Sequence, residues 1–353
     1  MGMGSLSTPL LVLVFAAAAA ATWAAGTVLS KTTDSLDVRF GLGDDLGGII
    51  LLAITGTLPE IAITTSAALA GHLGLAVGNL IGGVAVQTLV LVVLDFASDP
   101  DRPLSFLVGS LIPVVEALMV VVVLATAMSG AVLSPSTNLF GASPTSFAVV
   151  VFWLAGIWAV NRLRRDPAWR VEAPEATPGR RHQRQPLPGG QEHPYARRST
   201  TWIVLVFLAA AAVTLAAGVA LEDTGNALSG RIGVQGAVFG ATVLAAATAL
   251  PEISSGIAAV RLGDMSLAVG DILGGNAFQV TLFLLADLLA GTPVIVAEHH
   301  SDVWLGGVGL LMTGVAAAAI ILRPRRTFLR LGADSVLLAA IYAIAVVALT
   351  HIA

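Results

Sequence analysis

The sequence contains no cysteine, which excludes disulfides, thiolate metal sites and thiol nucleophiles. It also has little charge: Asp, Glu, Lys and Arg make up 11% of the 353 residues, whereas soluble domains carry about 25%. The net charge of −4 is small and the basic residues do not spread over a folded surface, so nucleic-acid binding is excluded. The motifs of an intramembrane enzyme, such as paired aspartates or H-E-x-x-H, are also missing, and we expect no enzymatic activity.

Apolar residues make up 56% of the chain and the mean hydropathy is +0.88, which predicts an all-α integral membrane protein in a lipid bilayer. Ten stretches are long enough to cross about 30 Å of hydrocarbon. They are 9–29, 46–70, 74–95, 104–128, 146–161, 202–221, 232–259, 266–290, 303–322 and 333–351. The first stretch is read as a transmembrane helix, because it exceeds the roughly 7 to 15 residues of a signal-peptide core. A cleaved signal ending near Ala24 is the alternative.

A polar segment, 161–200, separates two groups of five stretches. It is rich in Arg, Pro and Gly and predicts a flexible linker between a first unit, 1–160, and a second unit, 201–353. Its arginines predict a cytoplasmic position. Alternating ten spans from there leaves only Arg231, of 18 Lys and Arg, outside, and it puts both termini outside. The prediction is a multi-pass protein of the cell membrane.

The two units are copies of one another. At a constant offset of 192 residues, positions 58–95 match 250–287 without a gap and with 15 identities in 38. The matches include Leu-Pro-Glu-Ile, a double glycine, a glutamine and an aspartate, which shared apolar composition does not explain. Because each copy has an odd number of spans, the second enters the membrane from the opposite side. The sequence therefore predicts an inverted repeat, an architecture of secondary transporters with broken helices at the midplane.

The chemistry of the repeat centres on Leu-Pro-Glu, which occurs twice inside an apolar run. Its proline removes one donor and displaces the carbonyl four residues earlier, which is that of Thr55 in the first copy and of Ala247 in the second. The next residues, Glu60 and Glu252, carry carboxylates at membrane depth. An acid at that depth indicates a functional site. Loosened carbonyls and two carboxylates describe an oxygen site for a hard cation such as Ca²⁺. A proline kink with a protonated glutamate is the alternative.

Each copy continues with a double glycine and a glutamine, in GNLIGGVAVQ from Gly78 and GDILGGNAFQ from Gly270. Gly-Gly permits close helix packing or a break in the helix. Gln87 and Gln279 offer neutral amide oxygens, so we expect them in or near the cation site.

Four further acids have open roles. Asp271 lies eight residues before Gln279 and either lines an access path or is an acid near the membrane surface. Glu116 has no counterpart in the repeat and is either a proton-responsive group or a hydrogen-bonded structural acid. Asp95 and Asp287 close their spans, and we expect them to be solvated or to cap a helix.

The two segments that carry the repeated motifs, about 55–90 and 246–282, resemble the alpha repeats of the sodium/calcium exchanger family, within the calcium:cation antiporter superfamily. The family pattern reads G-T-S-x-P-E, followed by G-N-x-x-G-S-N-x-x-N or a version ending in Asp. The resemblance implies a transported-cation site and no cofactor. The ligands that it implies are the carboxylates of Glu60 and Glu252, the side chain of Thr57, and the carbonyls of Ala53, Gly56, Ala245 and Thr248.

The departures from the family pattern concern the coupling ion. Gly83 and Gly275 stand where the family has Ser, and Gln87 and Gln279 stand where it has Asn or Asp. Because several hydroxyls and a third carboxylate of the family pattern are missing, the resemblance does not imply an exchange of three Na⁺ for one Ca²⁺. The resemblance implies a Ca²⁺ antiporter that uses Na⁺ or H⁺ and works by alternating access. A monovalent cation/proton antiporter with the same pocket and a cation channel stay open as alternatives.

Overall fold

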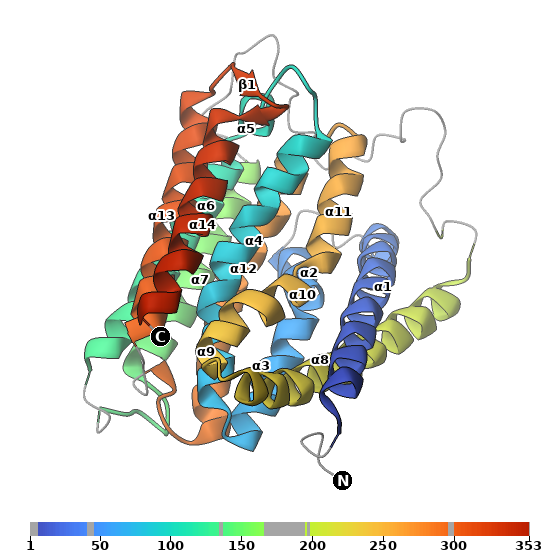
Figure 1. The fold of residues 1–353 in the computed structure, drawn as a ribbon. Helices are drawn as coiled ribbons and strands as arrows, with labels where there is room; N and C mark the ends of the chain where they lie inside the picture. The colour runs from blue at the N-terminus through green and yellow to red at the C-terminus, as the bar shows by residue number, and fades with distance from the viewer. Residues whose placement is uncertain are drawn as a thin grey trace.

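The computed structural model describes residues 6–40, 46–133, 137–165, 195, 198–295 and 300–352. Most of the linker predicted over 161–200 lies outside these ranges. The described chain is helical, with one two-residue hairpin (Figure 1). Its elements are α1 (Thr8–Phe40), α2 (Leu46–Gly56), α3 (Leu58–Ala70), α4 (Leu73–Ala97), α5 (Leu104–Leu107), α6 (Ile112–Ser129), η2 (Gly130–Val132), α7 (Pro144–Arg165), α8 (Thr200–Ile232), α9 (Gly236–Phe239), η3 (Gly240–Leu244), α10 (Ala245–Thr248), α11 (Leu250–Arg261), α12 (Met265–Ala290), α13 (His300–Leu322), β1 (Thr327–Phe328), β2 (Leu331–Gly332) and α14 (Ala333–Ile352).

The predicted helical class is confirmed, and every one of the ten predicted stretches contains helix. Within the described residues, seven helices are long and apolar enough to cross a membrane, or eight if the bent pair Gly236–Thr248 and Leu250–Arg261 counts as one span. Two shorter apolar helices, Leu58–Ala70 and Ala333–Leu349, fall below that length. The protein is therefore a multi-pass membrane protein, while a count of ten crossings stays a prediction. One predicted stretch, 104–128, is divided, because α5 ends at Leu107 and α6 begins at Ile112.

The order of helices in the first half recurs in the second. The bounds of α1 and α8 agree at both ends at the offset of 192, and α3 and α11 begin at matching residues. The double glycines do not break a helix, since α4 and α12 run uninterrupted through them. Gly78 and Gly82 instead let α4 touch the segment α9–η3: an added Cβ would lie 2.1 Å from the Ala237 carbonyl oxygen or 2.2 Å from Ala241 Cβ.

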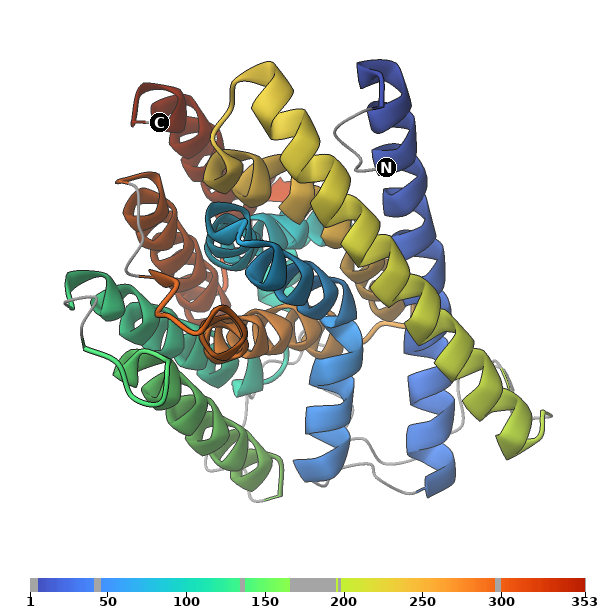
Figure 2. The same ribbon diagram turned by 90° about the horizontal axis from the view of Figure 1, so that it is seen from below.

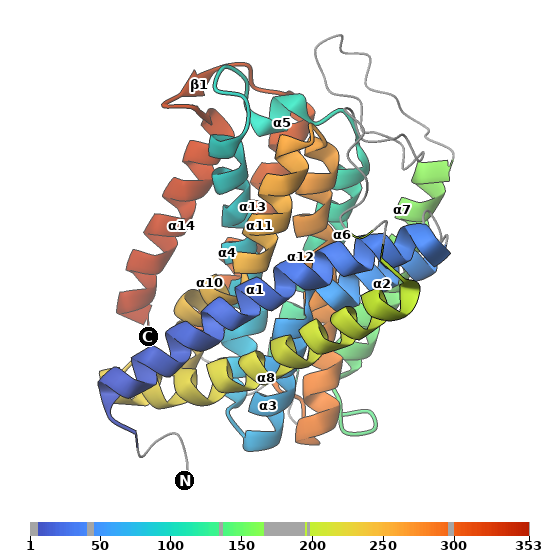
Figure 3. The same cartoon turned by 90° about the vertical axis from the view of Figure 1, so that its right-hand side faces the viewer.

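The long helices α1 and α8 pack against each other in opposite directions (Figure 3). At one end Nη1 of Arg39 donates to Oγ1 of Thr200 over 2.8 Å, and at the other Nη1 of Arg231 donates to Oγ1 of Thr8 over 2.9 Å. Each arginine also donates to a carbonyl two residues before its threonine, that of Arg198 or Leu6. All of these partners correspond at the offset of 192, so the pair has the self-complementary contacts of a two-fold interface.

Each long helix also touches the Leu-Pro-Glu motif of the other half. A Cβ on Gly26 of α1 would lie 2.7 Å from the Pro251 ring, and one on Gly218 of α8 would lie 3.1 Å from the Pro59 carbonyl oxygen. The two glycines correspond at the offset of 192, as do the two prolines. Viewed from below, the α1–α8 pair lies on the flank of the bundle away from α6 and α7 (Figure 2).

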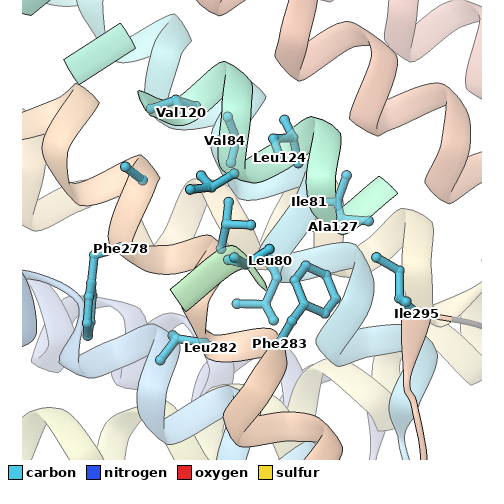
Figure 4. Packing of buried hydrophobic residues seen from close by; sticks show 14 of the residues in the cluster. Leu80, Ile81, Val84, Val120, Leu124, Ala127, Phe278, Leu282, Phe283 and Ile295 are labelled. Carbon is cyan, nitrogen blue, oxygen red and sulfur yellow. The ribbon is translucent and has the colours of Figure 1, made fainter. Parts of the chain in front are cut away.

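The main apolar core lies between α4, α6 and α12, where aliphatic and phenylalanine side chains from the three helices interlock (Figure 4). Leu80 and Val84 of α4, Val120 and Leu124 of α6 and Phe283 of α12 are all less than 2% exposed. These helices therefore form the packed centre of the bundle. On the outer helices, by contrast, large apolar side chains face outward, as expected where a helix contacts lipid. Examples are Leu13 of α1, Val151 of α7 and Leu205 of α8.

Asp95 and Asp287 are not solvated, as one reading of the sequence had it, but buried at 1% and 0% exposure. Asp95 accepts the N–H of Leu104 over 2.6 Å and that of Gly332, just before α14, over 2.7 Å. Asp287 accepts the N–H of Ser143, just before α7, over 2.9 Å. Each acid thus fixes the start of the last helix of the other half. Of the two predicted roles, this is closer to helix capping, but the capped helix belongs to the other half.

We expect Asp287→Ala to destabilise the protein by about 3 kcal/mol, because buried donors lose a charged acceptor. Besides Ser143, these donors are the Oγ of Ser146, at 2.7 Å, and the N–H of Val294, at 2.7 Å. The measurement is the midpoint of thermal unfolding in detergent. The matched control is Asp101→Ala, which removes an exposed acid; equal midpoints for the two variants would contradict the structural role.

Candidate cation-binding site

The two Leu-Pro-Glu motifs lie at two helix breaks. The first break is at Thr57, between α2 and α3, and the second is at Ala249, between α10 and α11, where the helix axes differ by 42°. In both cases the proline takes the first turn of the new helix, where its missing N–H costs no hydrogen bond. The five residues of η3, just before α10, form a π-turn, a feature frequent at functional sites. Whether the carbonyls of Thr55 and Ala247 bind a cation stays a prediction.

The breaks bring the two glutamates together. Glu60 of α3 is 0% exposed, while Glu252 of α11 is half-buried, and the two carboxylates interact electrostatically. Oε1 of Glu60 accepts a hydrogen bond from Nε2 of Gln87 over 3.2 Å, and the side chain of Thr248, from the other half, lies next to Glu60. Among the described residues, no donor reaches the buried Oε2 of either glutamate. Each half thus contributes one carboxylate with an unused oxygen.

The threonines and alanines of the predicted ligand set lie at the same breaks. Oγ1 of Thr57 donates to the Ala53 carbonyl over 2.8 Å, and Oγ1 of Thr248 donates to the Ala245 carbonyl over 3.1 Å. Both threonines are buried, and their lone pairs are available to a cation while the hydroxyl protons are held by these carbonyls. Gly56 is exposed at the end of α2. Cation binding by these groups stays a prediction.

The two glutamines, which correspond in the repeat, differ in what they bind. Gln87 bonds to Glu60, whereas Nε2 of Gln279 donates to the carbonyls of Asn79 and Leu80 on α4, over 3.1 and 3.0 Å. The Oε1 atom of Gln279 is buried and receives no hydrogen bond from the described residues. Gln279 thus has its amide nitrogen fixed on one helix and its oxygen unused.

The position of Gln279 also explains why Gly83 differs from the family pattern. A Cβ on Gly83 would lie 2.1 Å from Nε2 of Gln279, so even the first atom of a serine side chain overlaps the amide. The corresponding Gly275 has nothing within 4 Å of an added Cβ. The long amide at 279 and the missing side chain at 83 are therefore one coupled change.

Two residues that contact the predicted acids, one beside Glu252 and one beside Glu116, were not identified from the sequence. Oγ of Ser255 donates to the Glu252 carbonyl over 3.2 Å and to Oδ2 of Asp271 over 3.0 Å. Its spacing of three residues from Glu252 places it on the same helix face, a signal that was available. Arg164, 3.5 Å from Oε1 of Glu116, lies in the segment predicted as linker, and nothing in the sequence links it to Glu116.

Within the described part of the chain, no group of three or more Asp, Glu, His or Cys could hold one metal ion. A cation at the two glutamates would therefore be completed by neutral oxygens, from hydroxyls, amides and carbonyls, which suits hard cations. The chemistry of the donor set fits Ca²⁺ or Na⁺.

A family model described as sodium/calcium exchanger protein matches residues 10–161 and 202–351, once in each half. The chain belongs to the sodium/calcium exchanger family. Among relatives of this exchanger, the inner membrane protein YrbG of Escherichia coli (strain K12) is 26% identical over 265 residues, which are 74% of this chain and 73% of YrbG. The putative antiporter CaxA of Alkalimonas amylolytica is 25% identical over 284 residues, 79% and 78% of the two chains.

The fold of the exchanger is similar to that of a solved structure, the H⁺/Ca²⁺ exchanger CAX, with a TM-score of 0.67 at 14% sequence identity. The similarity covers 96% of this chain and 82% of CAX. The family model confirms the predicted family, and the fold is similar to that of a solved H⁺/Ca²⁺ exchanger.

We expect Gly83→Ser to destabilise the exchanger by about 1 to 3 kcal/mol, because it displaces the Gln279 amide from two carbonyls. The double variant Gly83→Ser/Gln279→Asp, which restores the family pattern, should recover part of that loss. The measurement is the thermal unfolding midpoint of each single variant and of the double variant. Gly275→Ser is the matched control and should be neutral; strictly additive changes at 83 and 279 would contradict the coupling.

Proposed function

We propose that this exchanger is a secondary-active antiporter that exports Ca²⁺ in exchange for Na⁺ or H⁺ by alternating access. The observation that carries the proposal is the meeting of Glu60 and Glu252, one from each half, at two helix breaks. Two negative charges balance one Ca²⁺, and charges buried in a membrane protein need such a counter-charge. The family membership and the similarity to a calcium exchanger support the same reading.

In this proposal Ca²⁺ binds to oxygen atoms from both halves, since the ion takes about six to eight oxygens in flexible geometry. The two carboxylates are the charged ligands. The neutral ligands are the hydroxyl of Thr57, the amide oxygens of Gln87 and Gln279, and the carbonyls of Ala53, Gly56, Ala245 and Thr248. The unused Oε2 atoms of the glutamates and the unused Oε1 of Gln279 support these roles.

The choice of coupling ion depends on the ligands that the Gly-Gly and Gln segments, 82–87 and 274–279, provide. Glycine at 83 and 275 removes two hydroxyls, and glutamine at 87 and 279 removes a carboxylate relative to the family pattern. A site with two carboxylates balances one Ca²⁺ against two protons or two Na⁺. A monovalent cation/proton antiporter would use the same neutral oxygens and is the competing function.

The proposed architecture is an inverted repeat of two five-helix units in the cell membrane, with the 161–200 linker in the cytoplasm and both termini outside. The antiparallel α1–α8 pair supports inversion, because corresponding helices of inverted copies run in opposite directions. Arg323, Arg325 and Arg330 stack on Phe106 or Phe96 at the end of the bundle that carries β1 and α5, which supports a cytoplasmic position for that end.

Transport of ⁴⁵Ca²⁺ in proteoliposomes, driven in turn by a Na⁺ gradient and a pH gradient, tests the proposal. We expect uptake under one gradient and none without it. Absence of Ca²⁺ uptake under both gradients, with Na⁺ or K⁺ uptake that excess Ca²⁺ does not reduce, would establish the monovalent antiporter instead. Ca²⁺ passage without any counter-ion gradient, measured as a reversal potential, would indicate a channel.

Glu60→Gln and Glu252→Gln should each abolish exchange, because a neutral amide keeps the shape of the side chain but removes its charge. Folding should be preserved, since removing a buried charge does not add a desolvation cost. The readout is initial ⁴⁵Ca²⁺ uptake, compared with thermal stability and with the surface variant Asp101→Asn as a control. If both glutamine variants still exchange Ca²⁺, the glutamates are protonated kink residues and the site is wrong.

A further inference from the structure

We propose that Asp34, Glu116 and Asp271 form a one-sided acidic path, which guides divalent cations to the central glutamates from the end of the bundle that carries α5 and β1. Asp271 is its innermost residue. The inference rests on the proposed function and adds the side from which the site takes its cation and the residues that capture it.

Asp271 is joined to the central site through one serine. Oγ of Ser255 lies 3.0 Å from Oδ2 of Asp271 and 3.2 Å from the carbonyl oxygen of Glu252. The carboxylates of Asp271 and Glu252 also interact electrostatically. Asp271 is half-buried, as is the α11 motif around Glu252, whereas Glu60 on α3 is fully buried. The site is thus less enclosed on the side of Asp271.

Glu116 supplies an unused oxygen on the same side. Its side chain is 5% exposed, and its Oε1 lies 3.5 Å from the guanidinium of Arg164. Among the described residues, Oε2 has no hydrogen-bond donor, and it lies 2.8 Å from where a Cβ of Gly270 would be. A buried carboxylate oxygen therefore faces α12 next to Asp271, over a residue that has no side chain.

Asp34 lies farther out, on α1, where its side chain is exposed. Asp271 interacts electrostatically with both Asp34 and Glu116. Asp34 is exposed, Asp271 is half-buried, and Glu116 and Glu60 are buried. Because no three acids or histidines of the described chain could hold one ion together, these carboxylates do not form a second cage. They attract a cation in succession.

The other half has no such path. At the offset of 192, the residues that correspond to Asp34, Glu116 and Asp271 are Asn226, Val308 and Asn79. All three carboxylates are therefore confined to one side. Among the buried acids toward the opposite end, Glu222 has both oxygens occupied: His72 Nδ1 lies 2.6 Å from Oε1, and Ser66 Oγ donates to Oε2 over 2.9 Å.

Carboxylates along one side of a path raise the local concentration of cations and their rate of capture. Among the described residues, Asp34 and Asp271 do so without a neighbouring cation of the kind that Glu116 has in Arg164. Divalent cations gain most, because the attraction is proportional to their charge. At the three corresponding positions of the other half, neutral amides and an aliphatic side chain exert no such attraction. An otherwise symmetric site would therefore capture Ca²⁺ more effectively from one side.

The test is ⁴⁵Ca²⁺/Ca²⁺ self-exchange by the full chain in inside-out and right-side-out membrane vesicles, which needs no coupling ion. Asp271→Asn should raise the half-saturating Ca²⁺ concentration about tenfold on the α5–β1 side only. The opposite side and the maximal rate should stay unchanged, because the asparagine keeps an oxygen for Ser255. Asp271→Glu, which keeps the charge, should stay close to wild type on both sides.

The control Asp101→Asn removes an exposed acid near α5 and should shift neither side. An unchanged half-saturation in Asp271→Asn would overturn the path, and so would equal losses on both sides, which indicate a structural role. No self-exchange by the wild-type chain would overturn the proposed function, and the path with it. A sided shift can arise only where the central site works, so the two failures are distinct.

Discussion

This exchanger has to hold two carboxylates, those of Glu60 and Glu252, among apolar helices, and the other features of the structure depend on this constraint. A charged group at membrane depth is tolerated where it has a partner or a cation. Oε1 of Glu60 accepts a hydrogen bond from Gln87, and Oε2 of each glutamate receives none from the described residues. The helix breaks, the prolines and the neutral oxygens around them all serve to place these two charges close to each other without a basic residue between them.

The two halves are connected by exchanged contacts rather than by simple packing of one unit on the other. The α1–α8 pair joins first-half Arg39 to second-half Thr200 and second-half Arg231 to first-half Thr8. Gly26 and Gly218 each meet the proline motif of the opposite half. The shared site is therefore positioned by contacts that occur in corresponding pairs.

Much of this arrangement could be predicted from the sequence, because its signals were local or repeated. Apolar length gave the helices, and the offset of 192 residues identified Glu60 and Glu252 as corresponding acids. What could not be predicted depends on side chains that meet only in the folded chain. Nothing in the sequence indicates that the Gln279 amide occupies the space above Gly83, or that Asp287 binds residues 143 and 146. The division of 104–128 was also missed, because hydropathy does not detect a turn inside an apolar run.

Reciprocal anchoring by Asp95 and Asp287 bears on how the protein is made. The start of α7 is held by Asp287, which the ribosome adds more than a hundred residues later, and the start of α14 is held by Asp95, which is made early. Before the second half is synthesised, Asp95 therefore lacks the N–H of Gly332, and the start of α7 lacks the carboxylate of Asp287. The contacts at the starts of α7 and α14 are therefore complete only after both halves of the chain have been made.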